Sequence, residues 1–394
     1  MKKQTQAIHL EYERRDAYDS LSVPVYNTLA YEFDNAAIMS EAFTDKIKAP
    51  DYSRVENPTV TNLERRVAAL TDAAHATAFN SGMAAISNTL MSLAAQGKNI
   101  VTSKHLFGNT YALLVATLRR FGVKVRLRDL TNIEAVREAI DDDTCCVFLE
   151  ILTNPQLEVA DLKAISEVAH EKNVPLVVDS TVIPFTQFSA KSLGVDIEVV
   201  SSSKYVSGGA TSLGGLVIDY GTPYNGDFAK RLYGEMLFNF GAYMTPQVAY
   251  MQTIGLETLD ARYRVQSSNA LVLAKKLRTL PQIQYVNYVG LEDNPYHELA
   301  QRQFGKTAGA MICIDLESKE ACFNFLNNLK LIHRATNLFD NRSLAIHPAS
   351  TIFGAFSENM RRSMDIKDTT IRLSVGLEDV DDLFEDIKQA VESL

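Results

Sequence analysis

The chain has 394 residues, of which 46% are hydrophobic and 22% are charged, and its formal net charge is −9. This length exceeds one ordinary hydrophobic core, so we expect two domains in a globular protein. The negative charge, with no cluster of Lys and Arg, argues against nucleic-acid binding, and no apolar run approaches the ~20 residues that a membrane span needs.

The first 57 residues lack the periodicity of a helix or a strand. Their charged start is not followed by an apolar segment, so we expect no secretory signal. Such a segment cannot bury its own apolar groups. We therefore predict an N-terminal arm over residues 1–57 that contacts a neighbouring subunit.

From about residue 58, amphipathic helices alternate with short apolar runs. This alternation predicts an α/β fold with a mostly parallel central sheet and helices on both faces. Helices are expected at 62–70, 110–121, 133–140 and 161–171, and strands at 99–103, 123–127, 145–150, 174–179, 197–201 and 214–219. Ligands bind at the carboxyl ends of such strands, where Glu150, Asp179 and Ser201 stand.

The remaining sequence predicts a smaller C-terminal α/β domain. One long helix over 256–280 is expected to lead into it, with strands near 310–315 and 370–375 and a last helix over 380–394. We therefore divide the chain into the arm, a large domain over 58–255 and a small domain over 256–394. The four cysteines show neither zinc spacing nor a disulfide framework, which predicts reduced thiols in a cytoplasmic protein.

Lys204 is the most informative residue, because it follows an apolar strand and three serines and precedes two glycines. A desolvated lysine amine loses its proton and forms imines, whereas an ordinary lysine after a strand is only a surface residue. Asp179 closes another apolar run, where it either caps the next segment or pairs with a buried cation. With the Ser81-Gly82 helix start, these groups match the needs of a pyridoxal 5'-phosphate site: an amine, a partner for the ring nitrogen and a phosphate cradle.

Further residues fit this interpretation less specifically. Gly82 and Met83 open a helix whose N–H groups can face a phosphate, and the G-x-G-x-x-G fingerprint of dinucleotide sites is missing. Arg54 could bind phosphate oxygens or form a surface salt bridge. Arg372 lies inside an apolar strand, where a substrate carboxylate or a structural acid could be its partner.

Together these motifs resemble the Cys/Met metabolism family of pyridoxal phosphate enzymes, the γ-family of fold type I. The matching segments are 5–9, 23–26, 52–59, 81–85, 178–181, 201–205 and 372–378. The stretch 338–351 looks most like the branch of O-acetylhomoserine sulfhydrylase and methionine γ-lyase.

The resemblance implies roles for individual residues. Lys204 would bind the cofactor covalently and move protons, and Asp179 would pair with the ring nitrogen. The phosphate would be held by Gly82, Met83, Ser201 and Ser203, and by Tyr52 and Arg54 from a neighbouring subunit. Phe107 would stack on the ring, Asn154 would contact the ring oxygen, and Ser343 and Arg372 would hold the substrate carboxylate.

The resemblance also implies an obligate dimer that assembles into a tetramer, and the sequence departs from the family at several positions. Phe107 stands where relatives carry a tyrosine, so the ring has no hydroxyl to help protonate a leaving group. Other departures are Ser180, Ala210, Phe353 and the linker between Glu150 and Asn154.

We expect γ-replacement on an activated homoserine ester, as in O-acetylhomoserine sulfhydrylases, forming homocysteine for methionine biosynthesis. The alternatives are methionine γ-lyase, cystathionine γ-synthase or cystathionine lyase of the same family, and a cofactor-binding partner protein without activity. The partners expected are a small amino-acid substrate and a sulfur donor.

Overall fold

The computed structural model describes residues 1–10 and 16–394, so residues 11–15 of the predicted arm lie outside the described part. Its larger sheet has seven strands in the order β1-β7-β6-β5-β4-β2-β3. Six of the strands are parallel to one another, and β7 alone in this sheet is antiparallel to its neighbours. The strands are β1 (His75–Phe79), β2 (Asn99–Ser103), β3 (Lys124–Arg128), β4 (Thr144–Glu150), β5 (Leu176–Asp179), β6 (Ile197–Val200) and β7 (Gly215–Asp219).

Alternate residues of the central strands face opposite sides of this sheet, as strand geometry requires. In β4, Val147 and Leu149 belong to one buried core, and Cys146 and Phe148 belong to another on the opposite face. Both faces are therefore covered, which explains why these strands read as continuous apolar runs. The mostly parallel sheet predicted from the sequence is confirmed.

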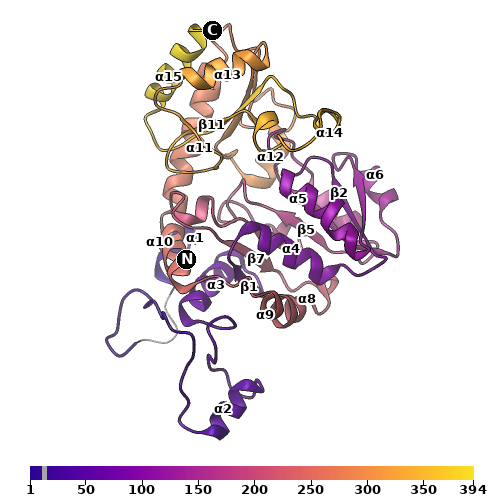
Figure 1. Cartoon of the computed structure of the whole chain (residues 1–394), viewed down its shortest axis with the longest axis vertical. Coiled ribbons are helices and arrows are strands. Elements are labelled where there is room, and N and C mark those ends of the chain that lie inside the picture. The colour runs from indigo at the N-terminus through magenta and orange to yellow at the C-terminus, as the bar shows by residue number, and fades with distance from the viewer. Residues whose placement is uncertain (11–15) are drawn as a thin grey trace.

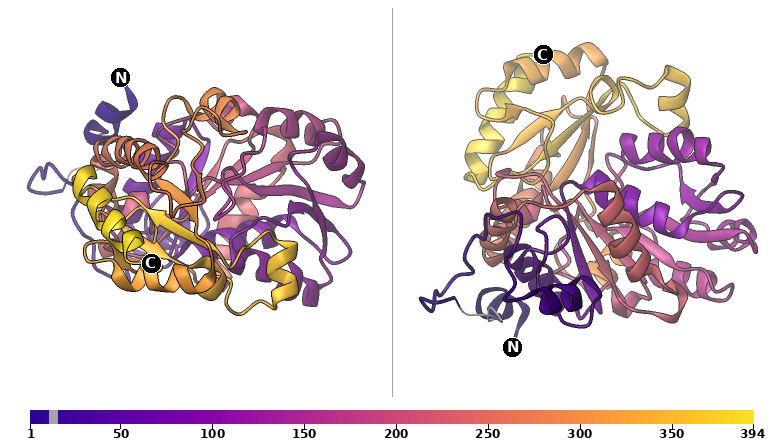
Figure 2. Two further views of the ribbon diagram at one scale, coloured as in Figure 1. Left: turned by 90° about the horizontal axis from the view of Figure 1, so that it is seen from above. Right: turned by 60° about the horizontal axis from the view of Figure 1, so that its bottom comes forward.

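A second sheet has five strands in the order β10-β11-β12-β9-β8, and only β10 and β11 are parallel. Figure 2 shows this orange and yellow C-terminal part to one side of the large sheet. Its strands are β8 (Tyr285–Asn287), β9 (Met311–Asp315), β10 (His333–Arg334), β11 (Leu344–Ile346) and β12 (Thr370–Ser374).

Fifteen α-helices lie within the described residues, and none of them is long and apolar enough to cross a membrane. Those before the second sheet are α1 (Lys3–His9), α2 (Ala36–Phe43), α3 (Pro58–Thr71), α4 (Gly82–Leu93), α5 (Gly108–Ala112), α6 (Ile133–Ala139), α7 (Leu162–His170), α8 (Phe228–Arg231), α9 (Phe238–Phe240), α10 (Pro246–Glu257) and α11 (Leu259–Leu277). Those within the C-terminal part are α12 (His297–Phe304), α13 (Lys319–Asn328), α14 (Glu358–Ser363) and α15 (Val380–Glu392).

Two predicted helices differ in detail from the structure. The helix expected over 256–280 begins only at Leu259, because α10 ends at Glu257 and Thr258 leaves the helical conformation with φ −102° and ψ 0°. The helix expected over 110–121 starts as α5 and continues through a π-helical turn (Leu113–Thr117) and a 3-10 turn (Leu118–Phe121). We propose that the large domain covers 58–255 and the small domain 256–394, so that α10 spans the boundary.

The N-terminal segment has two different parts. Helix α1 packs on its own chain, where the Lys3 Nζ donates to the carbonyl oxygens of Phe185 and Phe188 at 3.2 and 2.9 Å. A segment within residues 16–57 loops away from the body and carries α2 at its far end (Figure 1). Leu21, Leu29 and Phe43 on this projecting part are exposed. Helix α1 therefore does not belong to a projecting arm, and the predicted arm corresponds to the described residues from 16 to 57.

Candidate active site

The carboxyl ends of β4, β5 and β6 bring polar groups together at one edge of the large sheet. In the register of the sheet, Glu150 of β4 lies opposite Asp179 of β5, and Asp179 lies opposite Val199 of β6, so the ends of the three parallel strands are level. The backbone N–H of Thr181 donates to the Asp179 Oδ1 at 2.9 Å. Desolvation nevertheless raises the pKa of the Asp179 carboxyl, as expected for a partly buried acid that has no cationic partner among the described residues.

Lys204 lies four residues beyond the end of β6, and its amine points toward the loop between β10 and β11. Its Nζ donates to the Oδ1 of Asn337 at 2.8 Å. Burial, with a smaller contribution from the Arg372 cation, lowers the pKa of Lys204 from 10.5 to about 8. The structure therefore supplies the condition that makes a lysine amine nucleophilic near neutral pH.

Arg372 lies in the middle of β12 and is buried. Its Nη1 donates to the Asn154 Oδ1 at 3.2 Å, and its Nη2 donates to the Asn337 carbonyl oxygen at 3.1 Å. Its Nε has no partner in the described part of the chain, and burial lowers the pKa of the guanidinium to about 10. A buried guanidinium without a carboxylate is a ready site for an anionic ligand.

The start of α4 lies against the residues that follow β6. Ser81 caps this helix, accepting a hydrogen bond from the Ala84 N–H at 3.2 Å. A β-carbon at Gly82 would lie 2.5 Å from the Ser201 β-carbon, so only glycine allows this close approach. Met83 follows, and the Thr110 hydroxyl lies 3.9 Å from its sulfur. Helix N–H groups and the Ser201 side chain thus meet at one point.

Two predicted serines use their hydroxyl groups inside the protein. The Ser203 Oγ donates to the Gly214 carbonyl oxygen at 3.1 Å and accepts from the Gly214 N–H at 2.9 Å. The Ser343 Oγ donates to the Glu378 Oε2 at 2.9 Å and accepts from the Gly376 N–H at 2.8 Å. Both hydroxyls brace the backbone around the site.

Phe107 precedes α5, and its backbone is fixed by the edge of the large sheet. Its N–H donates to the Glu150 Oε1 at 2.5 Å. The next residue, Gly108, approaches the loop between β11 and α14 so closely that a β-carbon there would lie 2.9 Å from the Ile352 carbonyl oxygen. The backbone of Phe107 is therefore held between Glu150 at the end of β4 and the close contact of Gly108 with Ile352.

Tyr52 and Arg54 lie together at the end of the arm. The Arg54 guanidinium carbon is 5.5 Å from the centre of the Tyr52 ring, and an Arg54 N–H donates to the Phe238 carbonyl oxygen in α9. The Tyr52 ring is exposed. Within one chain the pair thus faces α9, and its expected contact with a neighbouring subunit remains a prediction.

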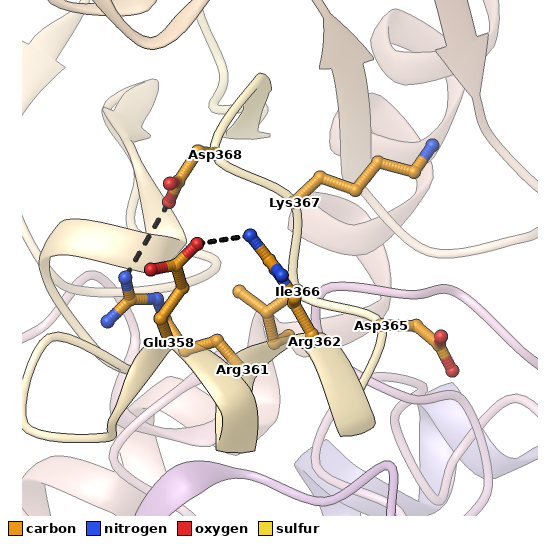
Figure 3. Close-up of a pocket in the computed structure, with 7 residues that line it drawn as sticks. All are labelled: Glu358, Arg361, Arg362, Asp365, Ile366, Lys367 and Asp368. Atoms are coloured by element: carbon orange, nitrogen blue, oxygen red, sulfur yellow. Dashed lines mark hydrogen bonds and ion pairs between the residues drawn. The ribbon is translucent and has the colours of Figure 1, made fainter.

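Two cavities are lined by residues other than Lys204, Asp179 and Arg372. One, of about 360 Å³, lies around α14, and its residues are drawn in Figure 3. Its arginines are paired with acids, Arg362 with Glu358 and Arg361 with Asp368. The other, of about 290 Å³, borders Pro155 and Cys313.

Asn337 is the site residue that the sequence interpretation missed. Its side chain holds the Lys204 amine and its carbonyl oxygen holds Arg372. It lies in a loop without periodicity, six residues before Ser343. The one sequence signal for a role of Asn337 is its polar amide directly before the stretch 338–351, which resembles the family.

Comparisons with known proteins agree with this geometry. The model of the family "Cys/Met metabolism PLP-dependent enzyme" matches residues 4–392. The chain belongs to this family. It is 38% identical to an L-methionine gamma-lyase of Fusobacterium nucleatum subsp. polymorphum over 394 residues, covering 99% of this chain and 98% of the relative. It is 31% identical to the O-acetyl-L-homoserine sulfhydrylase of Corynebacterium glutamicum over 417 residues, covering 98% of this chain and 95% of the relative.

Among solved structures, a putative O-acetylhomoserine (thiol)-lyase from Campylobacter jejuni superposes with a TM-score of 0.95. It is 34% identical, covers the full length of both chains, and carries N'-pyridoxyl-lysine-5'-monophosphate. The fold is that of the pyridoxal phosphate enzymes of fold type I, as predicted, and the cofactor of this family is pyridoxal 5'-phosphate.

The residues present fit this cofactor. Asp179 is a desolvated acid with no cation paired to it in the described part of the chain, Lys204 is an amine that burial makes nucleophilic, and Gly82 lets the start of α4 approach Ser201 at a place that a β-carbon would block. These are the partners that a pyridine nitrogen, an aldehyde and a phosphate group require.

Proposed function

We propose that the protein catalyses γ-replacement on an O-acylated homoserine. In the reaction the C–O bond to the acyl group breaks, a C–S bond to a sulfur nucleophile forms, and acetylhomoserine and sulfide become homocysteine and acetate. Family membership supports the chemistry of sulfur amino acids, and Phe107 supports the choice within the family. We further propose that the reaction serves methionine biosynthesis.

We propose that the cofactor is bound by groups from both domains. Lys204 bonds to the cofactor aldehyde, Asp179 pairs with the ring nitrogen and Phe107 stacks on the ring. The remaining contacts are assigned to Asn154 at the ring oxygen, to Gly82, Met83, Ser201 and Ser203 at the phosphate, and to Tyr52 and Arg54 of a second copy of the chain.

Pyridoxal phosphate supplies an electron-withdrawing ring that acidifies the α-hydrogen of a bound amino acid. The Lys204 amine accepts that proton, because its low pKa leaves a large neutral fraction near pH 8. The hydrogen bond from Nζ to Asn337 fixes where the lone pair points.

We assign the substrate carboxylate to Arg372. Its unpartnered Nε and its buried position favour an anion, and Asn154 and Asn337 hold the other two nitrogens. The family pattern gives Ser343 a share in this role, but its hydroxyl is used by Glu378 and Gly376, so we propose Asn337 in its place.

Phe107 is the observation that carries the proposal. Its ring has no hydroxyl group to give a proton to a leaving group. A carboxylate such as acetate leaves as a stable anion, whereas a thiolate is a stronger base, with a thiol pKa of about 8.5. The site therefore favours an ester over a thioether.

The product test uses the purified protein with acetyl-, succinyl- and phosphohomoserine, each with sulfide, methanethiol or cysteine. Homocysteine or another γ-substituted product is expected from an ester and a sulfur donor together. Absence of any such product would count against replacement.

Methionine γ-lyase is the second candidate, favoured by the 38% identity to the Fusobacterium enzyme over nearly the whole chain. It predicts ammonia and a 2-oxo acid from methionine alone. The argument from Phe107 can be tested with the variant Phe107→Tyr. The restored hydroxyl should raise the rate on methionine far more than the rate on acetylhomoserine, because it helps only the poorer leaving group.

We also propose a homo-oligomer in which arms are exchanged. The arm leaves Leu21, Leu29 and Phe43 exposed, and Leu213 and Phe240 are exposed on the body, so apolar surface is available on both sides. Arg54→Ala should loosen cofactor binding if Arg54 reaches a phosphate, and mass measurement in solution tests the assembly.

A further inference from the structure

Glu150 is a buried carboxyl group that the proposed mechanism does not use. It ends β4, directly beside Asp179 on β5. Residues paired across neighbouring parallel strands point to the same face, and such strands lie about 4.8 Å apart. Two acids therefore stand side by side at the place proposed for the pyridine ring.

The Glu150 carboxyl group contacts two of the proposed cofactor-binding segments. It accepts the Phe107 N–H at 2.5 Å, and it also forms a hydrogen bond with the backbone of Asn154. One side chain thus links the ring-stacking residue, the ring-oxygen residue and the neighbourhood of Asp179.

Both acids cannot be ionised cheaply in this desolvated place, since like charges at this separation repel strongly. Desolvation and, secondly, the Asp179 charge raise the pKa of Glu150 well above its usual range. Asp179 is the acid that a protonated ring nitrogen would keep ionised. A protonated Glu150 still offers the carbonyl oxygen that the Phe107 N–H needs.

We propose that Glu150 is a positioning residue that acts as an uncharged acceptor, orienting Phe107 over the cofactor ring while leaving Asp179 as the single anion beneath the ring nitrogen. This inference rests on the proposed cofactor contacts of Phe107 and Asp179. It does not depend on which sulfur reaction the protein catalyses.

The test compares Glu150→Gln, Glu150→Asp and Glu150→Ala as holoenzymes. Gln keeps the length and the acceptor but cannot ionise, Asp keeps an ionisable carboxyl group at a shorter length, and Ala keeps neither. Glu138→Gln, at an exposed position of α6, is the matched control. Cofactor affinity is measured by titration with pyridoxal 5'-phosphate, and ring orientation by the visible circular dichroism of the bound cofactor.

We expect Glu150→Gln to match the wild type within about twofold in affinity and to keep its dichroic signal. Glu150→Asp and Glu150→Ala should bind the cofactor about tenfold more weakly, as the loss of one buried hydrogen bond implies, and should lose dichroic amplitude. A higher cofactor affinity of Glu150→Gln than of Glu150→Asp is the result expected for an uncharged acceptor.

The opposite order, with Asp near the wild type and Gln weakened, would overturn the proposal, because Glu150 would then act as an anion. An unchanged dichroic signal in all variants, with losses only in thermal stability, would also overturn it. Lys204→Ala separates this outcome from failure of the site assignment: if that variant keeps the borohydride-reducible chromophore, the site itself is wrong.

Discussion

The Lys204 amine offers the most direct test of the site, because its reactivity without cofactor follows from burial. Its pKa is lowered from 10.5 to about 8, first by desolvation and then by the Arg372 cation. At pH 8 about half of such an amine is neutral, against about 0.3% of an ordinary lysine. The neutral fraction is therefore raised on the order of 100-fold.

Arg372→Gln perturbs the second cause alone. A neighbouring cation disfavours the ammonium form, so its removal should raise the pKa of Lys204 and reduce the neutral fraction at pH 8. The rise should be partial, since burial is the larger cause. Arg362→Gln, at an exposed position of α14, is the control that should change nothing.

The assay is competitive acetylation of the cofactor-free protein with trace reagent between pH 6 and 11, followed by mass spectrometry of the Lys204 peptide. The labelling rate of Lys204 should reach half its maximum near pH 8, while the labelling rate of an ordinary exposed lysine continues to rise above about pH 10. A Lys204 midpoint near 10, or a midpoint lowered by Arg372→Gln, would refute this reasoning.

Three other predictions follow from local geometry. Gly82→Ala should weaken cofactor binding about tenfold or more in a titration, because the new β-carbon collides with Ser201, whereas Gly234→Ala, with open space around it, should stay within about twofold. Asn337→Ala should lower kcat about tenfold with little change in cofactor content, because Lys204 loses its hydrogen bond, and an unchanged kcat would contradict that role. His105 forms hydrogen bonds with Glu158 and Asp365. Burial alone would lower the pKa of His105, but the two acids outweigh burial, and the net effect is a raised pKa. The contribution of His105 to stability is therefore present below about pH 6.5 and is lost as the pH rises through the folded pKa. Thermal unfolding should therefore show that His105→Gln costs more stability at pH 5.5 than at pH 8.5, and an equal cost at both would contradict the linkage.

The assignment of chemistry to Lys204 and Asp179 is accessible from the sequence, because each follows a strand that apolar residues mark clearly. Three parallel strands in register must end at one edge, so the order of strands along the chain is enough to group Glu150, Asp179 and Ser201. The family pattern adds Arg372, which the structure places beside Asn154.

The contribution of the C-terminal part of the chain to the site is harder to predict, because it comes from the loop between β10 and β11. Asn337 meets Lys204 across 133 residues, and nothing in the loop's composition distinguishes it from Ser343. The two residues are told apart by their partners: the Asn337 side chain accepts a hydrogen bond from Lys204, whereas the Ser343 hydroxyl donates to Glu378.

The order of residues along this chain determined the fold class and the reactive groups, since hydrophobic periodicity and strand ends are local properties. The packing of the two sheets decided how those groups behave. Burial makes Lys204 a better nucleophile, and strand register sets two acids side by side. Among the described residues, the buried Arg372 keeps a donor without a partner. These effects arise from desolvation and from distances between remote segments, which no local pattern of residues contains.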